Sequence, residues 1–196
     1  MSETAGIAKR VADPSLLPPR WARLLRSAVL IGTGLLITFS AAFHEQFGFD
    51  RAVVAAALAA IAVAHLIEGA QRRASGGAAV AFALGAVSLL AAALLMTVAS
   101  QIAFAVVIAA WALASALLEF VGTTVLPGSR QDAPLIGGVG LLLALTVLLT
   151  RGDLVAVIGF FGAYAVIAGV FLGIAAFDTR RATEAEDVAQ GTAVNA

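Results

Sequence analysis

The sequence has no cysteine and very little charge. Its 196 residues include 12 basic and 12 acidic side chains, two histidines and one tyrosine. The absence of cysteine excludes disulfides, cysteine-ligated zinc and iron–sulfur clusters, and two histidines are too few for a convincing haem or di-iron site. The charged fraction, 12%, is about half that of a soluble domain. This scarcity excludes an ordinary soluble enzyme, a disordered protein and a nucleic-acid binder.

What the sequence has in abundance is apolar residues. They make up 61% of the chain, and the mean hydropathy is +1.01. Six apolar runs approach the roughly 20 residues that a helix needs to cross a bilayer. The runs are continuous rather than alternating, which favours helices over barrel strands. The sequence therefore predicts an all-α polytopic membrane bundle of six transmembrane helices. The expected spans are about residues 27–43, 52–70, 78–99, 102–121, 135–150 and 154–177.

Polar segments flank this transmembrane domain, which covers residues 20–177. Residues 1–19 contain three prolines, and residues 178–196 are acidic and rich in small residues, so both are expected to be disordered cytoplasmic segments. A cleaved signal peptide is not expected, because five further apolar runs follow the first. Arginine and tryptophan just before the first run are typical of a membrane-interface anchor. The anchor residues are Arg20, Trp21, Arg23 and Arg26.

The basic residues are distributed unevenly between the two sides of the expected bundle. With the amino terminus inside, ten of the 12 lie on the inner side, and only Arg51 and Arg151 lie outside. Cytoplasmic loops of membrane proteins carry such an excess. Arginine also outnumbers lysine eleven to one, which favours a GC-rich bacterial source. We therefore expect a bacterial cytoplasmic (inner) membrane protein with both termini in the cytoplasm.

The six runs read as three similar hairpins. The first helix of each has a small residue followed by two leucines, at residues 34–36, 88–90 and 140–142. Near the end of the second helices, equivalent places hold Glu68, Glu119 and Leu172. Short connections make neighbouring helices antiparallel. The pattern predicts three repeated helical hairpins.

These motifs resemble those of the HdeD family, small six-helix bacterial inner-membrane proteins. The resemblance rests on the paired leucines and on two second-helix ends, Leu-Ile-Glu-Gly at 66–69 and Leu-Leu-Glu-Phe at 117–120, and it covers about residues 20–181. It implies an association with acid resistance or general stress response. It supplies no catalytic mechanism.

Three ionisable side chains fall inside the expected spans. At about 1.5 Å per residue, His65 and Glu68 lie roughly 20 Å and 24 Å from the outer end of their helix, and Glu119 lies roughly 25 Å from the outer end of its own. All three are therefore nearer the inner boundary than the centre of a core about 30 Å thick. Ionisable residues within a membrane are functional candidates by default.

Glu68 has a potential partner in its own helix. Arg72 follows four residues later, in the orientation that favours an ion pair. His65 lies one turn before Glu68 and could bond the same carboxylate, which would make a pH-responsive pair. A histidine packed against a backbone carbonyl is the remaining interpretation.

Glu119 has no basic residue three or four positions later in the chain. Ser115, one turn earlier, could donate a hydrogen bond to it. Otherwise its partner must come from another helix, which would make an interhelical ion pair. If the repeat is real, Glu68 and Glu119 lie close together and could alternatively share a proton. The arginines considered as partners are Arg23, Arg26, Arg72, Arg73 and Arg130.

Two further groups of residues have competing interpretations. Small residues on one face of the last helix, Gly162, Gly169 and Gly173, either pack within the bundle or form a homo-oligomer seam. Ionisable residues in two outer turns are expected to be solvated loop ends, with a pH-sensing patch as the alternative. These residues are His44, Glu45, Asp50, Arg51, Arg151 and Asp153.

The leading functional expectation is a non-enzymatic, HdeD-like integral membrane protein with a role in acid or stress response. The alternatives are a small transporter or proton-conducting bundle, and an accessory subunit of a larger membrane complex. The expected partners are the lipid bilayer and either a second copy or such a complex, with no nucleic acid. No cofactor, metal or catalytic residue is expected, because no nucleophile is placed with a base and no ligand cluster is present.

Overall fold

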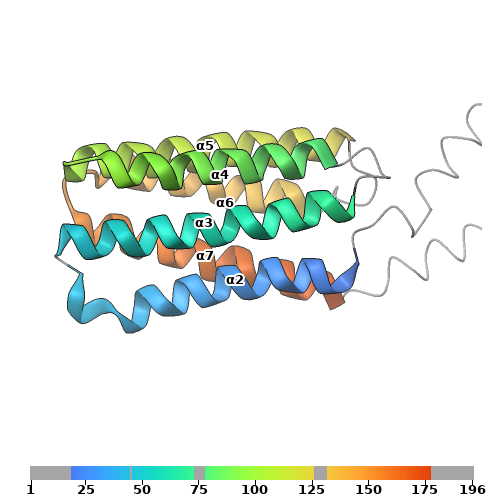
Figure 1. The fold of residues 1–196 in the computed structure, drawn as a ribbon, viewed down its shortest axis with the longest axis horizontal. Helices are drawn as coiled ribbons and strands as arrows, with labels where there is room; N and C mark the ends of the chain where they lie inside the picture. The colour runs from blue at the N-terminus through green and yellow to red at the C-terminus, as the bar shows by residue number, and fades with distance from the viewer. Residues whose placement is uncertain (1–18, 45, 73–77, 126–131, 178–196) are drawn as a thin grey trace, which may run out of the picture.

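The computed structural model describes residues 19–44, 46–72, 78–125 and 132–177, and these form six α-helices, one 3-10 turn and no strand (Figure 1). The all-α bundle predicted from the sequence is therefore confirmed. The expected terminal arms, apart from Pro19, lie outside the described residues. The elements are α2 (Arg20–Phe39), η2 (Ala41–Phe43), α3 (Phe47–Gln71), α4 (Ala78–Thr97), α5 (Gln101–Val125), α6 (Asp132–Leu149) and α7 (Leu154–Phe177).

The first helix differs most from its expected span of residues 27–43. α2 begins at Arg20, because backbone hydrogen bonding continues into the polar flank, whereas hydropathy marks only the part suited to hydrocarbon. It ends at Phe39. The next residue, Ser40, donates its hydroxyl to the carbonyl oxygen of Leu36 at 2.7 Å, a local bond that competes with continuation of the helix. The remaining helices begin and end within a few residues of expectation, α3 extending furthest beyond its expected start.

The bundle fits a polytopic membrane protein. Five helices, all except α6, are long and apolar enough to cross a membrane by length and composition. The apolar part of α6, Pro134–Leu149, is shorter. Large apolar side chains are exposed along the bundle, among them Leu90, Leu142 and Ile174. Soluble proteins rarely expose contiguous apolar surface of this kind, whereas lipid accommodates it.

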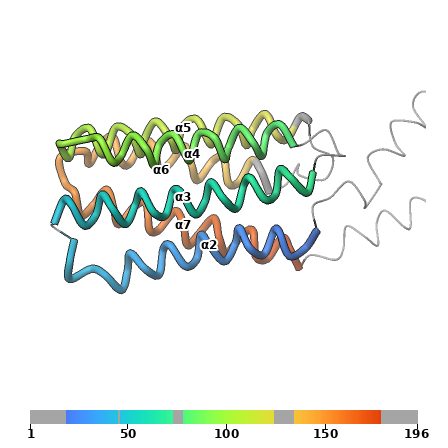
Figure 2. Tube along the Cα trace, viewed as in Figure 1, coloured from blue at the N-terminus to red at the C-terminus, as the bar shows by residue number. Residues whose placement is uncertain are grey.

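The helices form a closed circuit of antiparallel neighbours (Figures 1 and 2). Each helix contacts the next along the chain, and α7 returns to pack against α2. The closest pairs are α2–α7, α3–α4 and α5–α6, so each joins the second helix of one hairpin to the first helix of another. Three such pairs are the arrangement that a threefold hairpin repeat would produce. α2 begins and α7 ends at one end of the bundle, here called the termini end, and the opposite one is the turn end.

Glycines allow α2 and α7 to approach closely. A Cβ atom at Gly169 would lie 2.7 Å from Ile31 Cγ1 and 2.9 Å from the backbone nitrogen of the same residue. Ser27 Oγ donates a hydrogen bond to the carbonyl oxygen of Gly169 at 2.7 Å. Gly162 and Gly173 also face α2. In the structure these three glycines therefore pack within the chain, and α2 occupies the face that a second copy would need.

An apolar core fills the turn half of the bundle. It reaches Trp111 and Tyr164 near the middle, whose rings pack edge to face with centroids 5.8 Å apart. All six helices contribute to this core, and several of its side chains from α3, α5 and α7 are fully buried. They include Leu58, Phe104, Ile108, Ile158 and Phe161.

Candidate functional site

Four charged side chains meet inside the termini half of the bundle, and we call them the charge network. Arg26 of α2 donates a hydrogen bond to Glu119 of α5, and its guanidinium also lies 3.6 Å from a carboxylate oxygen of Glu68 on α3. Arg72, just after α3, donates to the other oxygen of Glu68 at 2.6 Å. The network thus joins three helices through one central guanidinium.

The charge network is buried and electrically balanced. Its side chains are only 8–12% exposed, and two guanidinium groups face two carboxylates. An unpaired buried charge is very costly, but mutual attraction and hydrogen bonding offset much of that cost when the charges are paired. Each carboxylate of the network contacts a guanidinium group.

The network follows the repeat, with one exception. Glu68 and Glu119 hold equivalent places in two hairpins, and the third equivalent, Leu172 of α7, is apolar. α7 packs closely against α2, which brings Arg26 to the network. Each of the three close helix pairs therefore contributes one side chain to the network. The α3–α4 pair contributes Glu68, the α5–α6 pair contributes Glu119, and the α2–α7 pair contributes Arg26, which contacts both carboxylates.

The structure settles where the intramembrane polar candidates lie. Arg73 and Arg130 lie outside the described residues; of the other arginines considered for Glu119, Arg26 is the one that binds it, and Arg72 pairs with Glu68 four residues earlier. The other two candidates differ from expectation: His65 makes no hydrogen bond to Glu68, and Ser115 makes none to Glu119. The Nδ1 atom of His65 and the Oγ atom of Ser115 are buried and have no hydrogen-bond partner.

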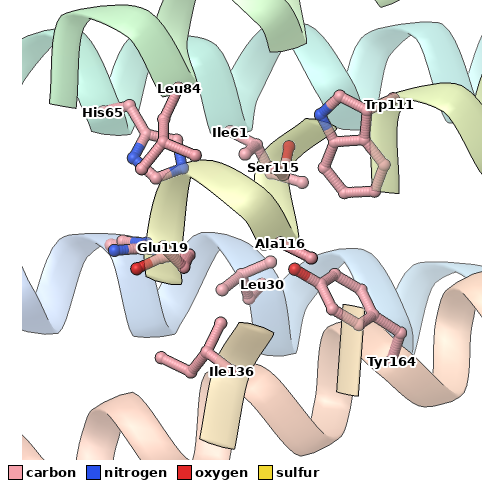
Figure 3. Close-up of a pocket in the computed structure, with 11 residues that line it drawn as sticks. Leu30, Ile61, His65, Leu84, Trp111, Ser115, Ala116, Glu119, Ile136 and Tyr164 are labelled. Atoms are coloured by element: carbon pink, nitrogen blue, oxygen red, sulfur yellow. The ribbon is translucent and has the colours of Figure 1, made fainter. Parts of the chain in front are cut away.

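A small cavity lies beside the charge network, and His65 and Ser115 line it together with Arg26 and Glu119 (Figure 3). Its volume is about 10 Å³. Polar atoms of the network, the histidine and the serine share its wall with apolar side chains. The lining residues are Arg26, Leu30, Ile61, His65, Leu84, Trp111, Ser115, Ala116, Glu119, Ile136 and Tyr164.

The expected interface anchor divides into two parts. Arg20 places its guanidinium 4.2 Å from the centre of the Phe177 ring, and Trp21 is half exposed. Arg23 donates to the carbonyl oxygen of Ala175 at 3.4 Å. These three residues lie at the termini end, as an anchor requires. Arg26 does not belong with them, because one further turn of helix directs it into the charge network.

A second buried polar pair lies at the turn end, and sequence reasoning missed it. His44 and Asp50 were expected to be solvated, but they are 9% and 0% exposed. His44 Nδ1 lies 2.6 Å from Asp50 Oδ1, and Nε2 lies 2.8 Å from the carbonyl oxygen of Ile37. The expectation was wrong because loop length says nothing about whether a loop folds back over the helix ends. The one available signal was an acidic residue in the first turn of α3, where the helix dipole favours it.

The geometry of this pair determines how many protons it holds. A carbonyl oxygen only accepts, so Nε2 of His44 must carry a proton. The contact between Nδ1 and Asp50 requires one more proton, on either the ring or the carboxyl group. The pair is therefore neutral overall, and it ties the segment after α2 to the start of α3.

We predict that Asp50→Leu lowers the free energy of unfolding by about 1–3 kcal/mol, because it leaves Nδ1 of His44 buried without a partner. Asp50→Asn should cost less, since the amide can donate to Nδ1 of a neutral imidazole that keeps its bond to Ile37. Thermal unfolding of the purified proteins in one detergent compares the two variants. If both variants lose the same free energy of unfolding, then the hydrogen bond between Asp50 and His44 does not stabilise the protein.

The chain matches no protein-family model, no curated protein and no solved structure.

Proposed function

We propose that this chain is a non-enzymatic integral membrane protein whose bundle is held closed by the charge network. The observation that carries the proposal is the pairing of Arg26 with Glu68 and Glu119 from two other helices. All four charges are matched inside the network. Groups used for transport or catalysis are commonly left poised to bind or exchange a charge.

The apolar core supports a sealed bundle. Between the charge network and the turn end, α3, α5 and α7 contribute Leu58, Ile108 and Ile158, all fully buried. A path for ions or protons through a membrane protein is lined by polar groups or water along its length. Among the described residues, the cavity beside the charge network is itself lined in part by residues of this apolar core, such as Ile61 and Trp111.

The resemblance to the HdeD family suggests the physiological setting. On that basis the protein acts in the bacterial inner membrane in response to acid or general stress. The excess of basic residues beside the termini favours a cytoplasmic location for both termini. The charge network then lies in the cytoplasmic half of the membrane, where its carboxylates are shielded from an acidic exterior by the apolar core.

A deletion strain tests the stress role. We expect its survival after a shift to low pH to fall below that of the parent, and a plasmid copy of the gene to restore it. Survival equal to the parent's at low pH and under other envelope stresses would contradict the proposed role and leave the fold unaffected.

A proton-conducting bundle is the second candidate, and the buried ionisable cluster on three helices is the observation in its favour. We predict that proteoliposomes carrying the purified protein take up protons at the rate of protein-free liposomes when a potential is imposed. Adding a protonophore at the end of each trace verifies that the vesicles are sealed. Faster uptake that Glu119→Gln abolishes would establish conduction instead.

A further inference from the structure

Three residues that line the cavity beside the charge network carry a buried polar atom without a hydrogen-bond partner: His65 at Nδ1, Ser115 at Oγ and Arg26 at Nε. His65 is 4% exposed and Ser115 is 7% exposed, and neither His65 Nδ1 nor Ser115 Oγ has a partner. They come from two different helices, α3 and α5, and both line the same space (Figure 3). Two such orphan groups facing one cavity are unusual, because buried polar side chains are nearly always hydrogen-bonded.

Two neighbouring side chains of the same region, Trp111 and Ser88, have other partners, whereas Nε of Arg26 is buried without one, like the two orphan atoms. Trp111 donates its Nε1 proton to Ser88 Oγ at 2.9 Å, and Ser88 in turn donates to the carbonyl oxygen of Leu84. Arg26 and Glu119, which also line the cavity, bind each other. The orphan atoms therefore need a partner that enters the cavity from outside the chain.

The size of the cavity selects that partner. Its volume of about 10 Å³ is at the lower limit for one water molecule and too small for a larger guest. Water can both donate and accept, so it suits a serine hydroxyl and either tautomer of a neutral histidine. A dry cavity of this size is usual only where its walls are apolar.

We propose that one structural water molecule occupies this cavity, hydrogen-bonded to His65 Nδ1 and Ser115 Oγ. The water extends the polar interior from the charge network toward the middle of the bundle, and stops at the apolar core. It accounts for two polar residues that have no other purpose in the packing. The site does not depend on the physiological role proposed above.

A double-mutant cycle on the full-length protein in detergent tests the water. With the water present, Ser115→Ala removes one of its ligands and lowers Tm by about 2–4 °C. His65→Leu lowers Tm by a similar amount. When His65→Leu is already present, adding Ser115→Ala lowers Tm by less than it does in the wild-type protein, because both residues act through the same water molecule. Without the water, each variant removes an unsatisfied group, so Tm stays the same or rises and the effects add.

Two matched variants keep the test decisive. His65→Asn retains a polar atom at about the position of Nδ1 and should recover most of the loss caused by His65→Leu. Ser88→Ala removes a buried hydroxyl that bonds Trp111 and Leu84 within the chain, and it calibrates the effect of losing a hydroxyl with known partners. If His65→Leu does not fold, an experimental structure that resolves ordered water decides the question. Density within hydrogen-bonding distance of both atoms supports the site, and an empty cavity overturns it.

Discussion

Replacing Arg26 with leucine is expected to lower the free energy of unfolding by about 3–5 kcal/mol, the usual cost of breaking a buried ion pair from one side. Arg26 is the guanidinium that Glu119 binds, and the only one within 4 Å of it among the described residues. Its loss leaves Glu119 buried on α5 without a matching charge. Glu68 suffers less, because Arg72 still binds it at 2.6 Å. Reversible unfolding in mixed micelles measures the loss.

A second substitution should reverse most of that loss. In Arg26→Leu combined with Glu119→Leu, no unpaired charge remains, and apolar replacements for a buried pair are often neutral or stabilising. Leucine suits this place, because Leu172 already holds the equivalent position in the third hairpin. If the double variant is as unstable as Arg26→Leu alone, the instability arises from lost packing around Arg26 and the charge argument fails.

The other large effect is expected at the α2–α7 seam. Gly169→Leu should destabilise the protein by about 1–3 kcal/mol or more, because overpacking forces helices apart. Even the first atom of the new side chain would lie 2.9 Å from the backbone nitrogen of Ile31, and a backbone atom cannot move aside as a side chain can. The shift would also disturb the hydrogen bond from Ser27 to the carbonyl oxygen of Gly169.

Gly159→Leu is the matched control. Gly159 lies on the same helix, is exposed, and has nothing within 4 Å of the position of a Cβ atom. It should leave Tm unchanged or raise it slightly, because leucine forms helix more readily than glycine. Comparable losses in both variants would show that α7 tolerates no leucine at a glycine position, and that close approach to α2 is not the cause.

The helices themselves were predictable from the sequence. The six apolar runs, their antiparallel order and the pair of Glu68 with Arg72 all follow from neighbours close in the chain, and the structure contains them. Helix ends were less predictable. α2 begins earlier and ends at Phe39, because its limits depend on backbone bonding and on the hydroxyl of Ser40 rather than on hydropathy.

The assignment of polar residues was only partly predictable. Arg26 was grouped with the interface anchor, since distance along the chain places it just before the apolar run. Its position in the structure depends on the rotation of α2 about its axis, which directs the side chain of Arg26 into the bundle. His44 and Asp50 were placed in solvated turns for the same reason, although the segment folds inward and buries both. Partners on their own helices were possible for His65 and Ser115, and packing against a backbone carbonyl was the alternative for His65, but in the structure both residues line the cavity and His65 Nδ1 and Ser115 Oγ have no hydrogen-bond partner.

Hydrophobic length is a property of consecutive residues, so the sequence by itself determined that this is a bundle of apolar helices suited to a membrane. Partner choice between helices depends on how each rotates about its axis and on contacts between distant residues. Only the tertiary structure could decide that α7 closes the bundle against α2, and that Arg26 meets a glutamate 93 positions away. Four of the few charged side chains meet in this way in one network, because inside an apolar bundle each charge requires a partner.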